Sequence, residues 1–224
     1  MEVSALAKSY GGLRPLRLRE LAVRRGEVVA VSGLDAAAAQ TLANLILGAI
    51  LPDSGEVKVG GRSTRLLADA REWLAFSEQV GLVSCRVVLL EGFTVAQNLA
   101  VPFTLDLDAV PDEAAALSRR LADEVGLSEG ETNARLSATS PLVHLKVQLA
   151  RSLAFNPELV VLEHPTALLA GHPSETLASA LRQAVRTRQS AALALTNDGV
   201  FARLAADRTF SLRPNTGRLV LVSR

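Results

Sequence analysis

The feature that most constrains the fold of this chain is a short apolar run followed by a tight turn and a helical pattern. Residues 27–32 read EVVAVS, an almost uninterrupted apolar strand of the kind that is buried on both faces of a parallel sheet. Over 36–50 the apolar residues recur at helical spacing and form one stripe. A buried strand that enters a helix through a turn is the basic unit of an α/β layered domain, so such a domain is predicted.

The same alternation continues along the chain. Three further apolar runs predict buried strands, at 80–84, 159–162 and 191–195. Apolar spacing or capping residues predict further helices, at 94–100, 112–125, 140–154, 174–188 and 200–206. Looser alternation predicts the remaining strands, at 2–6, 16–23, 56–59 and 218–222. Strands that alternate with helices in this way give a mostly parallel sheet.

Charge balance and cysteine content exclude several classes of protein. With 24 Lys+Arg against 23 Asp+Glu the net charge is +1, which argues against a nucleic-acid binder held by phosphate contacts. A single cysteine, Cys85, excludes an intramolecular disulfide framework and a cysteine-based zinc site, and we expect it to be half-buried.

Asp35 and Asn44 interrupt the apolar stretch 28–51, which favours a strand and a helix over a membrane span. No secretory signal opens the sequence, so a cytoplasmic location is expected.

The turn at Gly33 is the position at which phosphate-binding loops are built. Backbone N–H groups at the start of a helix, together with the helix dipole, attract an anion there. The usual loop reads G-x-x-x-x-G-K-[ST], and the equivalent stretch here is GLDAAAAQT, residues 33–41. Ala38 replaces the second glycine, Ala39 the lysine and Gln40 the hydroxyl residue. Taken alone, this stretch predicts an ordinary helix start.

The surroundings of this turn resemble an ATP-binding cassette, the nucleotide-binding subunit of membrane transporters. The similarity covers nearly the whole chain in the family's order and spacing, at 6–12, 41–59, 80–83, 93–99, 150–154, 157–166 and 207–208. The resemblance implies an α/β, P-loop NTPase-like layered sheet with an N-terminal antiparallel β part. It also implies a single domain over 1–224, with a helical subdomain at about 87–150.

The resemblance assigns roles to individual residues. The nucleotide-binding positions hold Tyr10, Gly33, Asp35, Ala38, Ala39, Gln40 and Thr41. Tyr10 would stack on adenine, or it is a partly exposed loop tyrosine. The magnesium positions hold Glu163 and Gln40, and the catalytic pair would be Glu163 with His164 at the general base, unless His164 is only a polar residue at a strand end. The signature that faces a partner cassette aligns with Ser140, Pro141 and Leu142, and the switch histidine with Asn197.

Most of these positions depart from the family's residues. Cys85 stands where the family has a glutamine, and Ala170 where it has an aspartate. The missing lysine removes the cation that meets the β and γ phosphates, and Asp35 adds a like charge nearby. Pro141 has no N–H, and Leu142 adds bulk where glycines let a partner approach a phosphate. The sequence therefore predicts weak or absent binding of Mg-ATP and little hydrolysis.

The resemblance also implies partners. They are a membrane-spanning transporter subunit and a second cassette, equal or different, with this chain peripheral on the inner face of the cell membrane. Residues 87–103, which include Phe93 and Phe103, occupy the family's docking segment for the membrane subunit. The run 97–105 is similar to cassettes of lipid-transport systems of the Mla type.

Two alternatives remain open at this point. One is a divergent ATPase that uses Glu163 and His164, with backbone amides after Gly33 in place of the lysine. The other is a soluble regulator unrelated to transport. A basic residue of a partner, placed at the interface so that it supplies the missing cation, would favour the first.

Overall fold

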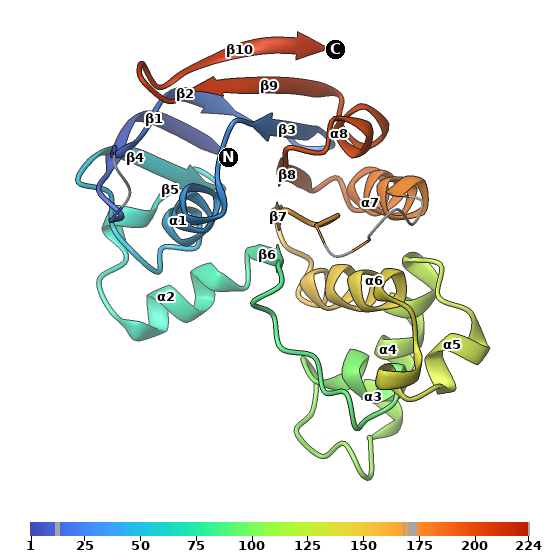
Figure 1. Cartoon of the computed structure of the whole chain (residues 1–224). Coiled ribbons are helices and arrows are strands. Elements are labelled where there is room, and N and C mark those ends of the chain that lie inside the picture. Colours follow the sequence, from blue (N-terminus) through green and yellow to red (C-terminus); the bar gives the residue numbers. More distant parts are fainter. Residues whose placement is uncertain (12–13, 168, 170–173, 224) are drawn as a thin grey trace.

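A six-stranded sheet is the centre of the fold. The computed structural model describes residues 1–11, 14–167, 169 and 174–223 (Figure 1). The strand order is β10 (Arg218–Ser223), β9 (Arg208–Arg213), β3 (Val28–Ser32), β8 (Ala191–Leu195), β7 (Leu159–Glu163) and β6 (Val80–Val83). All of these strands are parallel except β10, which pairs with β9 in the antiparallel sense. The predicted parallel α/β sheet is therefore confirmed.

A smaller antiparallel sheet comes from the N-terminal part of the chain. Its order is β2 (Leu16–Ala22), β1 (Glu2–Lys8), β4 (Ser54–Val59) and β5 (Arg62–Ser63). Leu16, Leu18 and Leu21 of β2 are buried, whereas Arg17 and Arg19 between them are exposed. This alternation is typical of a sheet with one solvated face, and it confirms the predicted antiparallel β part.

Helix α1 (Ala36–Ile46) lies between the two sheets (Figure 1). Its apolar stripe packs in one core cluster with the small sheet and with Val29 and Val31 of β3. The alternate residues of β3, Val28 and Ala30, belong to a second cluster on the opposite face. Successive side chains of a strand point to opposite faces, so this one apolar strand joins both cores.

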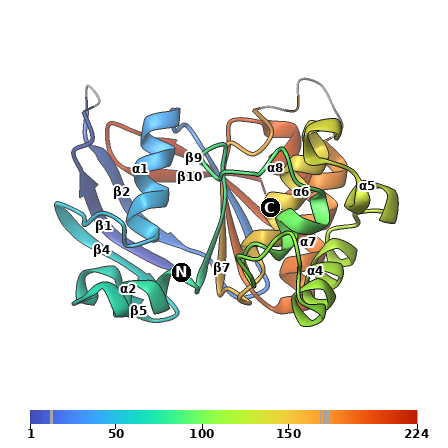
Figure 2. The same cartoon turned by 90° about the horizontal axis from the view of Figure 1, so that it is seen from below.

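The second face of the large sheet is covered by helices. They are α6 (Pro141–Ser152), α7 (Ser174–Arg188) and α8 (Gly199–Ala205), and α3 (Val95–Ala100), α4 (Asp112–Glu124) and α5 (Glu129–Asn133) lie beyond α6. Figure 2 shows this helical part on one side of the large sheet and α1 with the small sheet on the other. Among the described residues, no helix combines the length and the apolar character that a membrane span requires.

An ion pair ties α4 to α7. Arg188 donates from Nε and Nη2 to the two carboxylate oxygens of Glu124, at 2.6 Å each. A third guanidinium nitrogen donates to the carbonyl oxygen of Leu153, at the end of α6, also at 2.6 Å. Both charged side chains are largely buried, at 19% and 16% exposed. One arginine therefore joins three helices.

Candidate functional site

The carboxyl ends of the parallel strands meet at a cavity of about 420 Å³. Ligand sites of open α/β sheets form at this edge. The cavity is lined by the end of β7, by the loops that follow β3, β6, β7 and β8, and by residues of α1 and α6: Leu34, Asp35, Ala36, Gln40, Ser84, Cys85, Arg86, Leu145, Gln148, Glu163, His164, Pro165, Ala167 and Asn197. Five predicted site residues, Asp35, Gln40, Glu163, His164 and Asn197, thus line one cavity. Cys85 lies there too, and it is exposed, so the half-buried position that we expected is wrong.

The turn after β3 is fixed by side chain and backbone contacts. Gly33 has φ +85°, and a Cβ at this residue would stand 2.8 Å from the carbonyl oxygen of Leu212. The Asn197 side chain accepts a hydrogen bond from Gly33 N at 2.8 Å and donates one to Leu34 O at 3.0 Å. The residue at the switch position therefore holds the turn itself, with both ends of its amide engaged.

The carboxylate of Asp35 caps the N-terminus of α1. Asp35 caps the helix and accepts a hydrogen bond from Ala38 N at 2.7 Å, and its carbonyl oxygen accepts from Ala39 N at 2.9 Å. Ala38 and Ala39 are buried, at 5% and 0% exposed. The buried Thr41 hydroxyl donates to Ala37 O at 2.7 Å, and Gln40 is exposed. Helix thus runs through positions where a phosphate loop would wrap its ligand, because alanine is the strongest helix former.

Glu163 is paired with a residue that the sequence analysis did not place in the site. Arg86 donates to one Glu163 oxygen, from Nη2 at 2.8 Å and from Nε at 3.2 Å. Its other terminal nitrogen donates to Asn44 Oδ1 at 3.3 Å. Glu163 is 8% exposed and Arg86 34%. The available signal was that Arg86 lies shortly after β6, the parallel neighbour of β7, and so at the same edge of the sheet as Glu163.

Two polar side chains at the cavity have buried atoms without a partner. His164 directly follows β7 with φ +43°, and its backbone N–H donates to Leu195 O at 2.9 Å. Within the described part of the chain, its Nε2 has no hydrogen-bond partner. The same holds for Oε1 of Gln148, a residue on α6 that is 7% exposed and that the sequence analysis did not single out.

The remaining predicted residues lie elsewhere. Tyr10 packs, half-buried, against the core around α1, and burial, followed by the negative charge of Asp35, raises the pKa of its hydroxyl. Ser140 caps α6, Pro141 occupies its first turn and Leu142 packs on the helical core. These three begin the helix whose later residues reach the cavity. Ala170 is outside the described residues.

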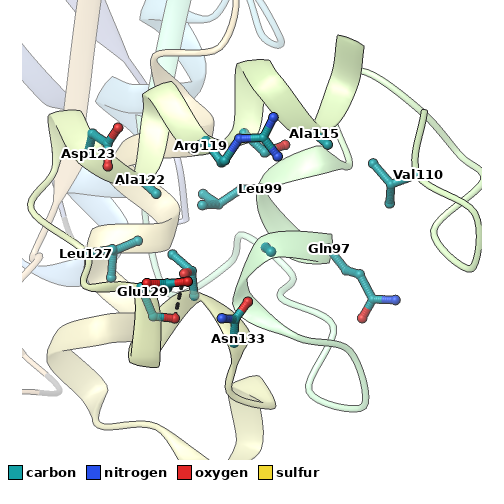
Figure 3. A pocket seen from close by; sticks show the side chains of 13 residues that line it. Gln97, Leu99, Val110, Ala115, Arg119, Ala122, Asp123, Leu127, Glu129 and Asn133 are labelled. Atoms are coloured by element: carbon teal, nitrogen blue, oxygen red, sulfur yellow. Dashed lines mark hydrogen bonds between the residues drawn. The ribbon is translucent and has the colours of Figure 1, made fainter. Parts of the chain in front are cut away.

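The predicted docking segment, 87–103, borders two further hollows. A cavity of about 500 Å³ between α3, α4 and α5 is lined by Gln97 and Leu99 of this segment (Figure 3). A groove of about 310 Å³ is lined by Val87 and Pro102, by Phe155, and by residues of α6, β6 and the end of α2 (Ala70–Ser77), among them Gln148 and Arg151.

Hydrogen bonds from two side chains fix the backbone of the loop at the start of this segment. Arg151 donates to Val88 O at 2.8 Å, and burial lowers the pKa of its guanidinium. The fully buried Asn98 accepts from Leu90 N at 2.8 Å and donates to Leu90 O at 2.9 Å. The Val88 side chain, by contrast, is 73% exposed.

Both the sequence and the structure of this chain are similar to known proteins. The family model described as "ABC transporter" matches residues 16–167. The sulfate/thiosulfate import ATP-binding protein CysA 2 of Chromobacterium violaceum is 31% identical over 98% of this chain, which spans 57% of that relative. The lipoprotein-releasing system ATP-binding protein LolD of Pseudomonas syringae pv. tomato is 31% identical over 90% of this chain and 86% of its own length. The dimeric bacterial ABC transporter cassette MJ0796 superposes with a TM-score of 0.79 at 22% identity, over 100% of this chain and 99% of the other.

Proposed function

Since this chain belongs to the ABC transporter family of ATP-binding cassettes, we propose that it is a cassette subunit which docks on a membrane-spanning transporter component and hydrolyses little or no ATP. In this proposal it is one domain over 1–224, with its helical subdomain at about 87–150. It works at the inner face of the membrane, beside a second cassette of the same or another kind. Similarity to LolD, together with the run 97–105, supports lipid or lipoprotein transport as the process.

The structure at the start of α1 is the observation that supports the proposed low ATPase activity. Members of the family bind phosphate through backbone N–H groups and a lysine in this turn. Here Asp35 takes up the N–H of Ala38, and a fully buried methyl group at Ala39 stands in the lysine position. A carboxylate at the helix start also repels the phosphates of ATP. The groups that would stabilise the transition-state charge are therefore engaged or absent, which supports a cassette kept for its surfaces.

We expect no phosphate release from Mg-ATP above that of protein-free buffer. Loss of the preorganised charge stabilisation alone lowers turnover by about a hundredfold or more. The measurement is steady-state phosphate release by the purified chain, with His164→Ala as the control. Release that disappears in His164→Ala would contradict the proposal and establish the divergent ATPase, in which His164 is the base. Release that persists in that variant would exclude His164 as the base, and release that co-purifies with the chain would still contradict the proposal.

The docking part of the proposal rests on exposed apolar side chains around the groove. Phe93 and Phe103, the aromatic residues of the predicted segment, are half-buried, and Phe103 packs edge-to-face on Phe155 with ring centroids 6.3 Å apart. Phe155 and Val88 are more accessible, at 54% and 73% exposed. Apolar side chains around a concave surface are typical of protein interaction sites. Phe155, which lines the groove, and Val88, which lies in the segment next to the groove residue Val87, are therefore better sites for a test than Phe93 and Phe103.

Val88→Asp and Phe155→Asp are each expected to lower recovery of the chain with the membrane fraction about tenfold, since a charge in an apolar interface costs more than about 1.4 kcal/mol. The chain is produced in its own host, and detergent-solubilised membranes are assayed for co-purification of a membrane-spanning subunit. Leu66→Asp is the matched control, because Leu66 is 71% exposed but lies beside the small sheet. Equal recovery of all three variants and the wild type would rule out this docking surface and favour the soluble regulator.

A further inference from the structure

We propose that Arg86 takes the place of the magnesium ion in this cassette, and that its guanidinium excludes divalent metal from the site. The family's nucleotide is bound with magnesium, and Glu163 stands at the metal position. This inference deepens the proposed function, because it concerns the metal side of the same cavity. It does not depend on whether nucleotide binds.

The carboxylate that would hold the metal already has a cation. Glu163 is 8% exposed, and both contacts from Arg86 converge on a single one of its oxygens, at 2.8 and 3.2 Å. Asn44 Oδ1 accepts from the same guanidinium at 3.3 Å, so the arginine is held on two sides. A buried carboxylate needs a positive partner, and here the chain supplies one from the loop after β6.

With Arg86 in place, neither of the two carboxylates that line the cavity is free to bind a magnesium ion. Magnesium requires near-octahedral oxygen ligands at close range, usually with one or two free carboxylates. The second carboxylate at the cavity, Asp35, is engaged in capping α1. Across 1–11, 14–167, 169 and 174–223, no three His, Cys, Asp or Glu side chains gather as a metal-binding group. The cation position is therefore filled by a side chain that cannot dissociate or lose its charge.

Removing the guanidinium should uncover a metal site. The probe is Mn²⁺ without nucleotide, followed through water-proton relaxation, on the full chain. We expect the wild type to show no saturable binding below about 1 mM, and Arg86→Gln to gain one site at least tenfold tighter. Adding Glu163→Gln to Arg86→Gln should remove that site again. Arg62→Gln is the matched control, because it breaks an exposed ion pair with Glu72 and should gain nothing.

Two results would overturn the inference. One is saturable Mn²⁺ binding by the wild type that Glu163→Gln abolishes, and this arm holds even if Arg86→Gln does not fold. The other is a folded Arg86→Gln variant, checked by circular dichroism, that gains no site. Phosphate release from Mg-ATP without Mn²⁺ binding would contradict the proposed function alone, so the two failures are distinguishable.

Discussion

Replacing Arg188 with alanine is expected to lower the free energy of unfolding by about 3 kcal/mol, which corresponds to a fall in Tm of about 6 to 12 °C. The substitution leaves the Glu124 carboxylate, which is 16% exposed, without its cation, and it leaves Leu153 O without its donor. A buried charge that loses its partner is costly because water cannot replace the lost hydrogen bonds. Equilibrium unfolding in urea, followed by circular dichroism, measures the loss.

Arg182→Ala is the control for this prediction. Arg182 lies on the same helix, and its pair with Asp207 is longer, at 3.7 Å, and more exposed, at 30% and 38%. Ion pairs of this kind contribute about 1 kcal/mol or less. Arg188→Lys should fall between the two, since it keeps the charge and loses the two parallel hydrogen bonds. If Arg182→Ala were as destabilising as Arg188→Ala, the prediction that the buried Arg188–Glu124 pair contributes more to the free energy of unfolding than an exposed pair would be wrong.

Gly33→Ala is expected to cost about 2 kcal/mol or more. A left-handed backbone disfavours any residue with a Cβ, and here the added Cβ would also stand 2.8 Å from Leu212 O. Because the contact is with backbone of β9, the strand must shift for the methyl group to fit. The same unfolding measurement tests this prediction.

Gly61→Ala separates the two causes. Gly61 has φ +78°, and a Cβ there would meet nothing within 4 Å. It should therefore show only the backbone penalty, about 1 kcal/mol. A cost for Gly33→Ala no greater than that of Gly61→Ala would mean that the turn moves away from β9 freely.

The fold was largely predictable because its strongest elements have strong local signals. The strand at 28–32 is apolar on both faces, and Thr94 and Gln97 form a capping box at the start of α3. Helices α2 (Ala70–Ser77) and α5 were missed. Only Phe76 of α2 and no residue of α5 is buried, so neither shows the apolar stripe from which helices are recognised.

The site was predictable to the extent that it follows from strand order. Residues that come directly after parallel strands share one edge of the sheet, and this rule brings Asp35, Glu163 and Asn197 together. The same rule places Arg86 at this edge, but its pairing with Glu163 joins side chains 77 residues apart, and local sequence patterns do not predict which side chains at the edge make contact. Asn197 illustrates the same limit, because its position at this edge was predictable but its hydrogen bond with the backbone N–H of Gly33 was not.

Gln148 lies between the cavity at the strand ends and the groove. It lines both the cavity at the strand ends and the groove beside Phe155. Because one residue of α6 lines both hollows, a substitution at Gln148 alters the cavity and the groove at the same time. The two hollows therefore cannot be varied independently at this position.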